Sequence, residues 1–250
     1  MKKWREAHHA VVIGASSAIG AAIAKRLRGG KRFVTAISRR QPGPETADAW
    51  WPADVRDRAA LEDALAASER ANGAIDALVY AAGEPAMGET LAVPEEVARA
   101  AFDVNFWGLE RAVRAVLPGM MAREDGFILA VLSLAASRAI PHEAYYGASK
   151  AAAARWLECV AHEAEPRGVR VRYVCPGYIP TGFLERGGWH GMTVPHVNGS
   201  GITPDDVAVR ALSLAGRRAV GEVIGWRERT ITFADRIAPG LYDRWRARRR

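Results

Sequence analysis

Residues 10–20 read AVVIGASSAIG and join a short apolar run to a turn of small residues. The first four residues are all aliphatic, as expected of a strand buried on both faces of a parallel sheet. Small side chains then let the backbone turn tightly and expose its N–H groups at the start of an apolar helical pattern. Strand, turn and helix in this order favour a nucleotide-binding unit with a pyrophosphate at the helix N-terminus. A plain strand–helix turn is the alternative.

The alternation of short apolar runs with longer amphipathic runs continues along the chain. It predicts an α/β fold: a Rossmann-type, doubly wound parallel sheet of about seven strands with helices on both faces. Strands are expected at 10–13, 32–37, 49–53, 75–80, 127–132, 169–174 and 222–225. Helices are expected at 19–27, 59–70, 95–117, 145–163 and 204–214. Since no linker interrupts the pattern, we expect residues 1–250 to form a single dinucleotide-binding and catalytic domain.

Composition narrows the function classes. The 250 residues include two cysteines far apart, Cys159 and Cys175, which form neither a disulfide framework nor a zinc spacing. We therefore expect a cytoplasmic protein without a metal site. No apolar run reaches the ~18 residues of a membrane span, and residues 1–6 lack a signal-peptide core. The net charge of +7 is compatible with nucleic acid, but no nucleic-acid-binding signature accompanies it, and no such partner is expected.

Two arginines, Arg39 and Arg40, follow the second expected strand. In dinucleotide folds an acidic residue at this point binds the ribose 2′-hydroxyl of NAD, whereas an arginine accommodates the 2′-phosphate of NADP. A guanidinium group suits a phosphate dianion, and no acid is present here. The pair therefore predicts NADP(H), with a solvated surface pair as the alternative.

The segment YGASK at 146–150 places a tyrosine and a lysine on one face of an expected helix. A phenol has a reference pKa of ~10 and is a poor base at neutral pH. An ammonium group at ~4 Å in an effective dielectric of ~20 supplies roughly the 4 kcal/mol that would bring this pKa to ~7. Tyr145 lacks a lysine at the fourth position, so Tyr146 is the candidate general acid or base.

Three further segments occur in register with Tyr146. Ser133 closes the fifth expected strand, Asn105 lies in DVNFWG at 103–108, and CPGYIPT at 175–181 follows the sixth strand. Together with the turn at 14–20, this set resembles the short-chain dehydrogenase/reductase family over about residues 10–181. Singly, each has another interpretation: a strand-end cap for Ser133, a helix cap or kink for Asn105, and an ordinary turn at 176–177.

The resemblance implies the roles of the site residues. The catalytic set is Asn105, Ser133, Tyr146 and Lys150. The cofactor set is Gly14, Ser16, Ser17, Ile19, Gly20, Arg39, Arg40, Asp54, Val55, Ala82, Gly83, Tyr146, Lys150, Pro176, Gly177, Ile179 and Thr181. In the family Asp54 would lie near the adenine amino group, and Asn105 would hold a water that relays protons to the lysine.

Several positions depart from the family pattern. Ile13 and Ala18 replace a threonine and the middle glycine of the turn, and both asparagines are missing from the segment before Ala82-Gly83. Ser17 stands where many NADP-dependent members carry a second basic residue. The chain after Gly221 also differs from the family's usual ending, which leaves the interface made there open.

We expect an NADP(H)-dependent oxidoreductase that moves a hydride between nicotinamide and a carbonyl or secondary alcohol. Ser133 would orient the substrate oxygen, and Lys150 would tune Tyr146 and hold the ribose. The alternatives are a non-catalytic NADP(H)-binding regulator and a sugar-nucleotide epimerase or dehydratase. The intact catalytic set argues against the regulator, and the short chain argues against the epimerase.

The segment at 181–201 lacks clear periodicity, and its apolar residues are interspersed with glycines at 182, 187, 188 and 191 that would act as hinges. It predicts a mobile apolar lid over a small, apolar carbonyl or alcohol substrate, or else a loop packed against a neighbouring subunit of a homodimer or homotetramer. Its candidate substrate contacts are Phe183, Leu184, Trp189, His190 and Met192; His142 is a further candidate. Residues 240–250 form a basic tail, for which contact with an anionic membrane surface is less favoured than a solvated or subunit-capping role.

Overall fold

The computed structural model describes residues 8–194 and 201–237, and its centre is one parallel sheet. Each of the seven strands pairs in parallel with its neighbours, in the order β3-β2-β1-β4-β5-β6-β7. The strands are β1 (His9–Ile13), β2 (Phe33–Ile37), β3 (Ala49–Trp51), β4 (Ala77–Tyr80), β5 (Gly126–Val131), β6 (Val169–Cys175) and β7 (Gly221–Val223). The order reverses between β1 and β4, and ligands of such sheets bind at the carboxyl ends of the strands at this switch point.

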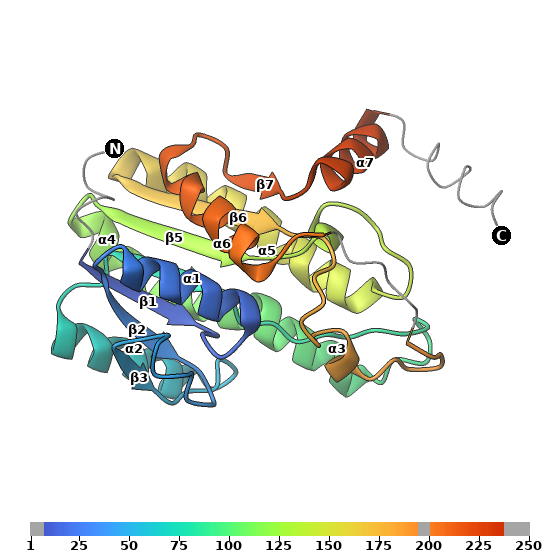
Figure 1. The fold of residues 1–250 in the computed structure, drawn as a ribbon, viewed down its shortest axis with the longest axis horizontal. Coiled ribbons are helices and arrows are strands. Elements are labelled where there is room, and N and C mark those ends of the chain that lie inside the picture. The colour runs from blue at the N-terminus through green and yellow to red at the C-terminus, as the bar shows by residue number, and fades with distance from the viewer. Residues whose placement is uncertain (1–7, 195–200, 238–250) are drawn as a thin grey trace.

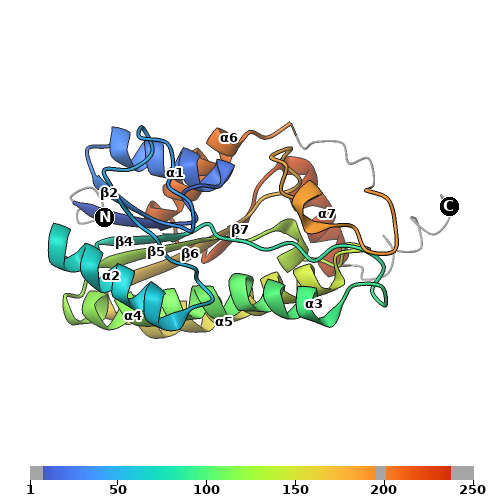
Figure 2. The same ribbon diagram turned by 90° about the horizontal axis from the view of Figure 1, so that it is seen from below.

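Helices cover both faces of the sheet (Figures 1 and 2). One face carries α1 (Ala18–Gly29) and α6 (Pro204–Ser213), which pack together. The other carries α2 (Arg58–Asn72), α4 (Gly108–Ala122) and α5 (Ala144–Ala164). The short α3 (Glu95–Phe102) leads into α4, and α7 (Trp226–Ile237) follows β7. The predicted doubly wound α/β fold is confirmed.

Alternation along the strands divides the core in two. In β1, Val11 and Ile13 join the cluster under α2, α4 and α5, whereas Ala10 and Val12 join the cluster under α1 and α6. Successive strand residues point to opposite faces, so each central strand needs apolar side chains at every position. This requirement explains the continuous apolar runs of the sequence.

The predicted elements are present with ends that shift by a few residues, but two features differ. The single helix expected at 95–117 is interrupted by a π-helical turn, Asp103–Trp107, between α3 and α4. Such turns insert one residue into the helix and often lie at functional sites. Helix α7 was not predicted, because its charged residues obscure the apolar stripe.

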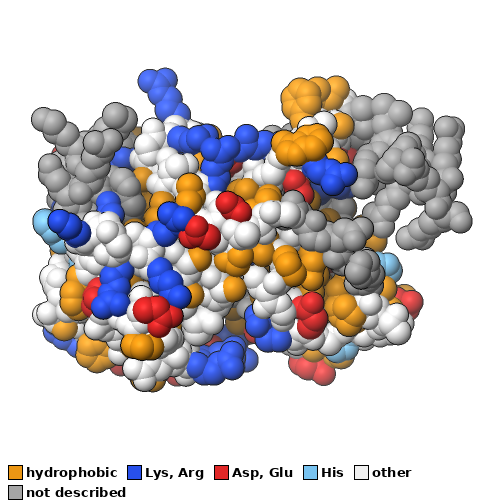
Figure 3. Space-filling view, in the orientation of Figure 1, with side chains coloured by type: hydrophobic (Ala, Val, Ile, Leu, Met, Phe, Trp, Pro, Cys, Tyr) orange, Lys and Arg blue, Asp and Glu red, His pale blue; other side chains and the backbone are white. Residues whose placement is uncertain are grey.

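Helix α7 carries its apolar stripe on the surface. Trp226, Phe233 and Ile237 are each more than half exposed, and Figure 3 shows hydrophobic side chains gathered over this helix. Within the described residues, no helix is both long and apolar enough to cross a membrane. The predicted basic tail at 240–250 and residues 195–200 of the predicted lid lie outside the described residues.

Candidate active site

A cavity of about 730 Å³ lies where β1, β2 and β5 end. Ligand pockets generally measure about 300–1,000 Å³. Its walls bring together every residue of the predicted catalytic and cofactor sets except Gly20 and Asn105. The predicted residues in its walls are Gly14, Ser16, Ser17, Ile19, Arg39, Arg40, Asp54, Val55, Ala82, Gly83, Ser133, Tyr146, Lys150, Pro176, Gly177, Ile179 and Thr181.

The turn after β1 is held by its own polar groups. Ser17 is the N-cap of α1: its hydroxyl donates to the Gly14 carbonyl at 2.8 Å and accepts from the Gly20 N–H at 3.1 Å. Gly14 has a φ of +84°, and a Cβ there would lie 2.5 Å from the Ala82 nitrogen. The first N–H groups of a helix lack intrahelical acceptors, so this end of α1 offers the cavity donors for an anion.

Gly20 serves the same turn from behind the cavity wall. A Cβ at this position would lie 2.3 Å from the Gly14 carbonyl oxygen. The glycine therefore allows the helix to pack against the turn, and it does not line the cavity itself. Gly20 would therefore contribute to cofactor binding by shaping the turn and not by touching the cofactor.

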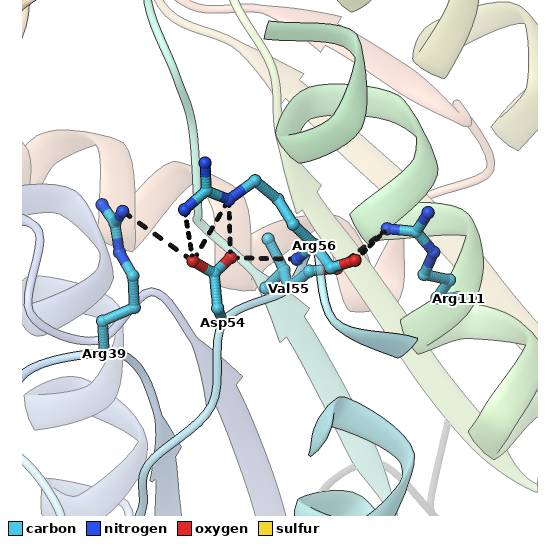
Figure 4. A network of polar contacts seen from close by, with 5 residues as sticks. All are labelled: Arg39, Asp54, Val55, Arg56 and Arg111. Carbon is cyan, nitrogen blue, oxygen red and sulfur yellow. Dashed lines mark hydrogen bonds and ion pairs between the residues drawn. The ribbon is translucent and has the colours of Figure 1, made fainter. Parts of the chain in front are cut away.

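Asp54 is the centre of a charged network beside the end of β2 (Figure 4). The Arg56 side chain donates to both carboxylate oxygens at 2.7–3.1 Å, and the Arg56 backbone N–H adds a bond of 3.0 Å. These bonds lower the pKa of Asp54. Arg111 fixes the loop by donating to the carbonyls of Val55 and Arg56 at 3.1 and 3.2 Å. The predicted contact of Asp54 with adenine would share oxygens that Arg56 already uses.

Arg39 approaches this network from the other side. Its Nη1 lies 4.0 Å from Asp54 Oδ2, and its side chain is 62% exposed. At this distance and exposure the ion pair is weak. The guanidinium group therefore keeps donors for a further anion at the cavity mouth.

Tyr146, Ser133 and Lys150 meet inside the cavity. Tyr146 is 6% exposed, and its hydroxyl is hydrogen-bonded to the Ser133 side chain. Lys150 lies one turn along α5, with its Nζ 5.8 Å from the centre of the Tyr146 ring and 3.3 Å from the Val131 carbonyl oxygen. The predicted convergence of the three side chains is present.

The electrostatics of this group differ from our expectation. Burial raises the pKa of Tyr146 above its usual value, and the Ser133 hydrogen bond opposes this only in part. Burial also lowers the pKa of Lys150 to about 8. Desolvation disfavours both charged forms and outweighs the attraction assumed for a pair at ~4 Å. Without a ligand, Tyr146 is thus a neutral phenol and a proton donor.

Asn105 lies in the π-helical turn and is completely buried. Its side-chain amide donates to the Glu84 carbonyl and to Ser149 Oγ, and its oxygen accepts from the Glu84 N–H, all at 2.9 Å. Ser149 in turn donates to the Tyr146 carbonyl at 2.7 Å. Asn105 therefore ties the chain after β4 to the first turns of α5. Its role in a water relay stays a prediction.

The segment after β6 covers the other end of the cavity. Phe183, Leu184 and Trp189 line it as predicted, with the Phe183 ring 5.8 Å from the Tyr146 ring. His190 and Met192, also predicted, are not in the cavity wall, whereas His142 is.

This segment is docked through its backbone. The Glu89 N–H donates to the His190 carbonyl at 2.9 Å, and the His190 N–H donates to the Met87 carbonyl at 3.2 Å. A Cβ on Gly187 or Gly191 would lie 2.7 Å from Pro85 or Ala92. These two glycines, predicted as hinges, permit close packing instead. Movement of the segment as a lid stays a prediction.

Sequence reasoning missed several ionisable residues at this end. Arg138, Glu143 and Arg186 all line the cavity. Arg138 is 8% exposed and lies 4.0 Å from Asp235 of α7, and Arg186 packs over the Phe183 ring. Burial raises the pKa of Glu143 to about 7. The available signal was the position of Glu143 only three residues before Tyr146 in the sequence. The predicted apolar wall is present, but it is interspersed with charge.

The model of the family described as short chain dehydrogenase matches residues 8–187. The chain belongs to this family. Among relatives, a 2,3-dihydro-2,3-dihydroxybenzoate dehydrogenase of Bacillus subtilis is 34% identical over 183 residues, which cover 69% of this chain and 70% of the relative. Oxidoreductase UcpA of Salmonella typhimurium is 38% identical over 134 residues, or 53% of this chain and 51% of the relative. The match to the latter thus spans about half of its length.

A solved short chain dehydrogenase shares the fold. The protein from Burkholderia cenocepacia, in complex with NADP, aligns with a TM-score of 0.80 and 28% identity over 97% of this chain and 98% of its own. The seven-stranded sheet and its flanking helices are therefore those of the short chain dehydrogenase family.

Proposed function

We propose that this short chain dehydrogenase is an NADP(H)-dependent oxidoreductase that interconverts a carbonyl and a secondary alcohol, with Tyr146 as general acid and base. One observation carries the proposal. A single cavity joins the open N-terminus of α1 and Arg39 to the hydrogen-bonded pair Tyr146 and Ser133. A dinucleotide in this cavity would extend from a phosphate site to a proton donor.

The residues present fit such a cofactor. Gly14 leaves no space for a side chain between the turn and Ala82, so backbone alone borders a pyrophosphate there. Arg39, with one long contact to Asp54, would pair with the 2′-phosphate, and Arg40 also lines the cavity. The cavity wall also contains the other predicted cofactor residues Val55, Ala82, Gly83, Ile179 and Thr181. The Burkholderia relative with bound NADP supports this choice.

The catalytic roles follow from the environment of each group. When bound, the nicotinamide supplies or accepts the hydride. Ser133 orients the substrate oxygen, and Tyr146 donates its proton to that oxygen during reduction. The raised pKa of Tyr146 in the ligand-free cavity suits this direction. Lys150 holds the ribose and returns a proton to Tyr146, and Asn105 positions the wall beside it and a relaying water.

We extend the proposal to the whole chain. Residues 1–250 act as a single domain, residues 181–201 close over a small-molecule substrate, and the protein works as a homodimer or homotetramer. Size-exclusion chromatography with light scattering measures the last point directly. A monomer at the working concentration contradicts it.

The test is consumption of NADPH with a panel of aliphatic and aryl ketones, followed by absorbance. The wild type should oxidise NADPH with at least one ketone. Tyr146→Phe should bind NADPH as well as the wild type does and lose about 100-fold or more in kcat, the scale of general acid catalysis. NADPH binding without oxidation by any ketone would instead indicate a regulatory binder.

A further inference from the structure

Glu143 is a carboxyl group in the active-site cavity that the reaction above does not use. It immediately precedes α5, three residues before Tyr146, and both side chains line the cavity. The charge of Glu143 also acts on the Tyr146 hydroxyl and adds to the rise of its pKa that burial causes. The carboxyl group therefore lies in the part of the cavity where the reacting oxygen would meet Tyr146.

The protein offers this carboxyl group no partner within the described residues. Burial alone raises its pKa to about 7, without any hydrogen bond or ion pair that would oppose the shift. The Glu143 backbone is fully engaged: its N–H donates to the Ile140 carbonyl, and its carbonyl accepts from the Gly147 N–H. A partly buried acid without a partner costs stability, which selects for a role in binding.

Helix capping does not account for Glu143. The carboxyl group forms no cap hydrogen bond at the start of α5. The helix dipole would also favour the ionised form and lower the pKa, whereas the pKa is raised. The side chain therefore serves the cavity rather than the helix end.

The neighbouring charges select the kind of ligand group. Arg138 and Arg186 line the cavity together with Glu143, and their positive charges disfavour a substrate ammonium group there. A substrate carboxylate would be repelled by ionised Glu143. A hydroxyl group satisfies both protonation states, because it donates to the carboxylate and accepts from the carboxylic acid.

We propose that Glu143 binds a hydroxyl group of the substrate, so that the preferred substrates are hydroxy ketones and the products are diols. The proposal rests on the proposed function, since it concerns the substrate end of the same cavity. It replaces a purely apolar substrate with one that carries a hydroxyl group a short distance from the reacting carbonyl. The apolar walls from Phe183, Leu184 and Trp189 would cover the rest of the substrate.

The experiment compares ketones that differ only by exchange of a hydroxyl for a methyl group. The pairs are 2-hydroxyacetophenone with propiophenone, and 4-hydroxy-2-butanone with 2-pentanone. In at least one pair the wild type should show a kcat/KM roughly 10-fold or more higher for the hydroxy ketone, the scale of a hydrogen bond to a charged group. Glu143→Met should abolish this ratio.

Two further variants keep the test interpretable. Glu143→Gln, nearly isosteric, should retain only part of the preference, and it replaces Glu143→Met if that protein does not fold. Glu163→Met makes the same change at an exposed position of α5 and should keep the wild-type ratio. The proposal is overturned if the wild type has the same kcat/KM for both ketones of each pair, or if the preference for the hydroxy ketone persists in Glu143→Met.

A second readout needs no turnover. NADP⁺ carries no hydride with which to reduce a ketone, so calorimetry on the NADP⁺-bound protein measures Kd values without reduction of the ligand. The Kd ratio within each pair should follow the same order and should collapse in Glu143→Met. If no ketone is reduced, the proposed function fails, but the Kd ratios still decide the role of Glu143.

Discussion

Gly14, in the cavity wall, and Gly88, which pairs with His190 next to the cavity-lining Trp189, both lie where a side chain would not fit. Both have a positive φ, and a Cβ on either would collide with backbone: the Ala82 nitrogen at 2.5 Å for Gly14, the His190 oxygen at 2.2 Å for Gly88. Gly14 lies between a buried strand and a capped helix. Gly88 lies in an irregular segment that pairs with His190 through an isolated bridge. The contact between Gly14 and Ala82 is thus fixed by regular secondary structure, whereas the contact between Gly88 and His190 is fixed by the packing of two loops.

The difference separates the tasks of the two ends. At the proposed cofactor end, backbone groups would hold the pyrophosphate and Arg39 the 2′-phosphate, so the geometry of the pyrophosphate site is set by the sheet and tolerates little change. The substrate end uses side chains such as Phe183, Trp189 and Glu143, so its shape and polarity can change without disturbing the sheet. Substitutions at the first end should therefore affect cofactor binding, and those at the second should affect the substrate.

The largest effect is expected at the cofactor end. Gly14→Ala forces a strained φ, which costs about 1–3 kcal/mol, and adds a collision with Ala82. We expect NADPH affinity to fall by about 100-fold or more, measured by fluorescence titration. Gly29→Ala is the matched control, because this glycine ends the same helix with an ordinary φ and open space around its Cβ. Equal NADPH affinities for the two variants would show that the turn does not hold the pyrophosphate.

Arg39→Asp tests the side chain on which the cofactor choice depends. A charge-assisted hydrogen bond contributes about 1.5–3 kcal/mol, so the wild type should prefer NADPH over NADH by roughly 10- to 150-fold. The aspartate repels the 2′-phosphate and accepts from a free ribose hydroxyl, which should reverse the preference. Arg40→Asp should change the ratio less, because consecutive side chains at a strand end point apart. An unchanged ratio in Arg39→Asp refutes the assignment.

Gly88→Ala probes the substrate end with the same substitution as Gly14→Ala. The added Cβ collides with the His190 carbonyl and should release the segment around Trp189 from its docked position. We expect the KM for a ketone to rise by about 10-fold, since strain of about 1–3 kcal/mol reduces the fraction of protein ready to bind. NADPH affinity should stay at the wild-type value. A loss of NADPH affinity would mean that the two ends are coupled.

The smallest effect is a pH-dependent gain in stability from Glu143→Gln. Burial raises the folded-state pKa of Glu143 from 4.5 to about 7, so folding holds its proton more tightly than the unfolded chain does. Stability is therefore lost as the pH rises from about 4.5 through 7. The variant avoids this loss and should gain about 1–2 kcal/mol at pH 8, or roughly 2–8 °C in Tm, with little gain at pH 4.5. Glu163→Gln, at an exposed site, should show no such trend; a pH-independent gain in Glu143→Gln contradicts the shift.

The contrast between regular structure at one end of the cavity and loop packing at the other also explains which features could be predicted from the sequence. Strands with an apolar residue at every position are buried on both faces, so the sheet could be predicted from residue types. The small residues after Ile13 likewise predicted the tight turn at the proposed cofactor end. Tyr146 and Lys150 share a helix face, which a period of 3.6 residues reveals. The packing of Gly187 against Pro85 joins segments about a hundred residues apart, and no local pattern records it.

The electrostatic environment of the site residues was the other feature that could not be predicted from the sequence. The sequence shows that Lys150 is near Tyr146, but not that both are buried so deeply that desolvation dominates the pKa of each. Likewise, Arg56 follows Asp54 by two residues, yet its grip on both carboxylate oxygens depends on the loop that Arg111 holds. Side-chain environments of this kind require the three-dimensional structure.

Transfer of deuterium from NADPH labelled at C4 of the nicotinamide tests the central claim most directly. The protein is incubated with the (4R)- or the (4S)-labelled cofactor and the ketone panel, and the product alcohols are examined by mass spectrometry. We predict that one of the two labelled forms places a single deuterium on the carbinol carbon in the wild type, with about 100-fold slower transfer in Tyr146→Phe. Bound NADPH with no deuterium in any product, from either labelled form, would contradict the account.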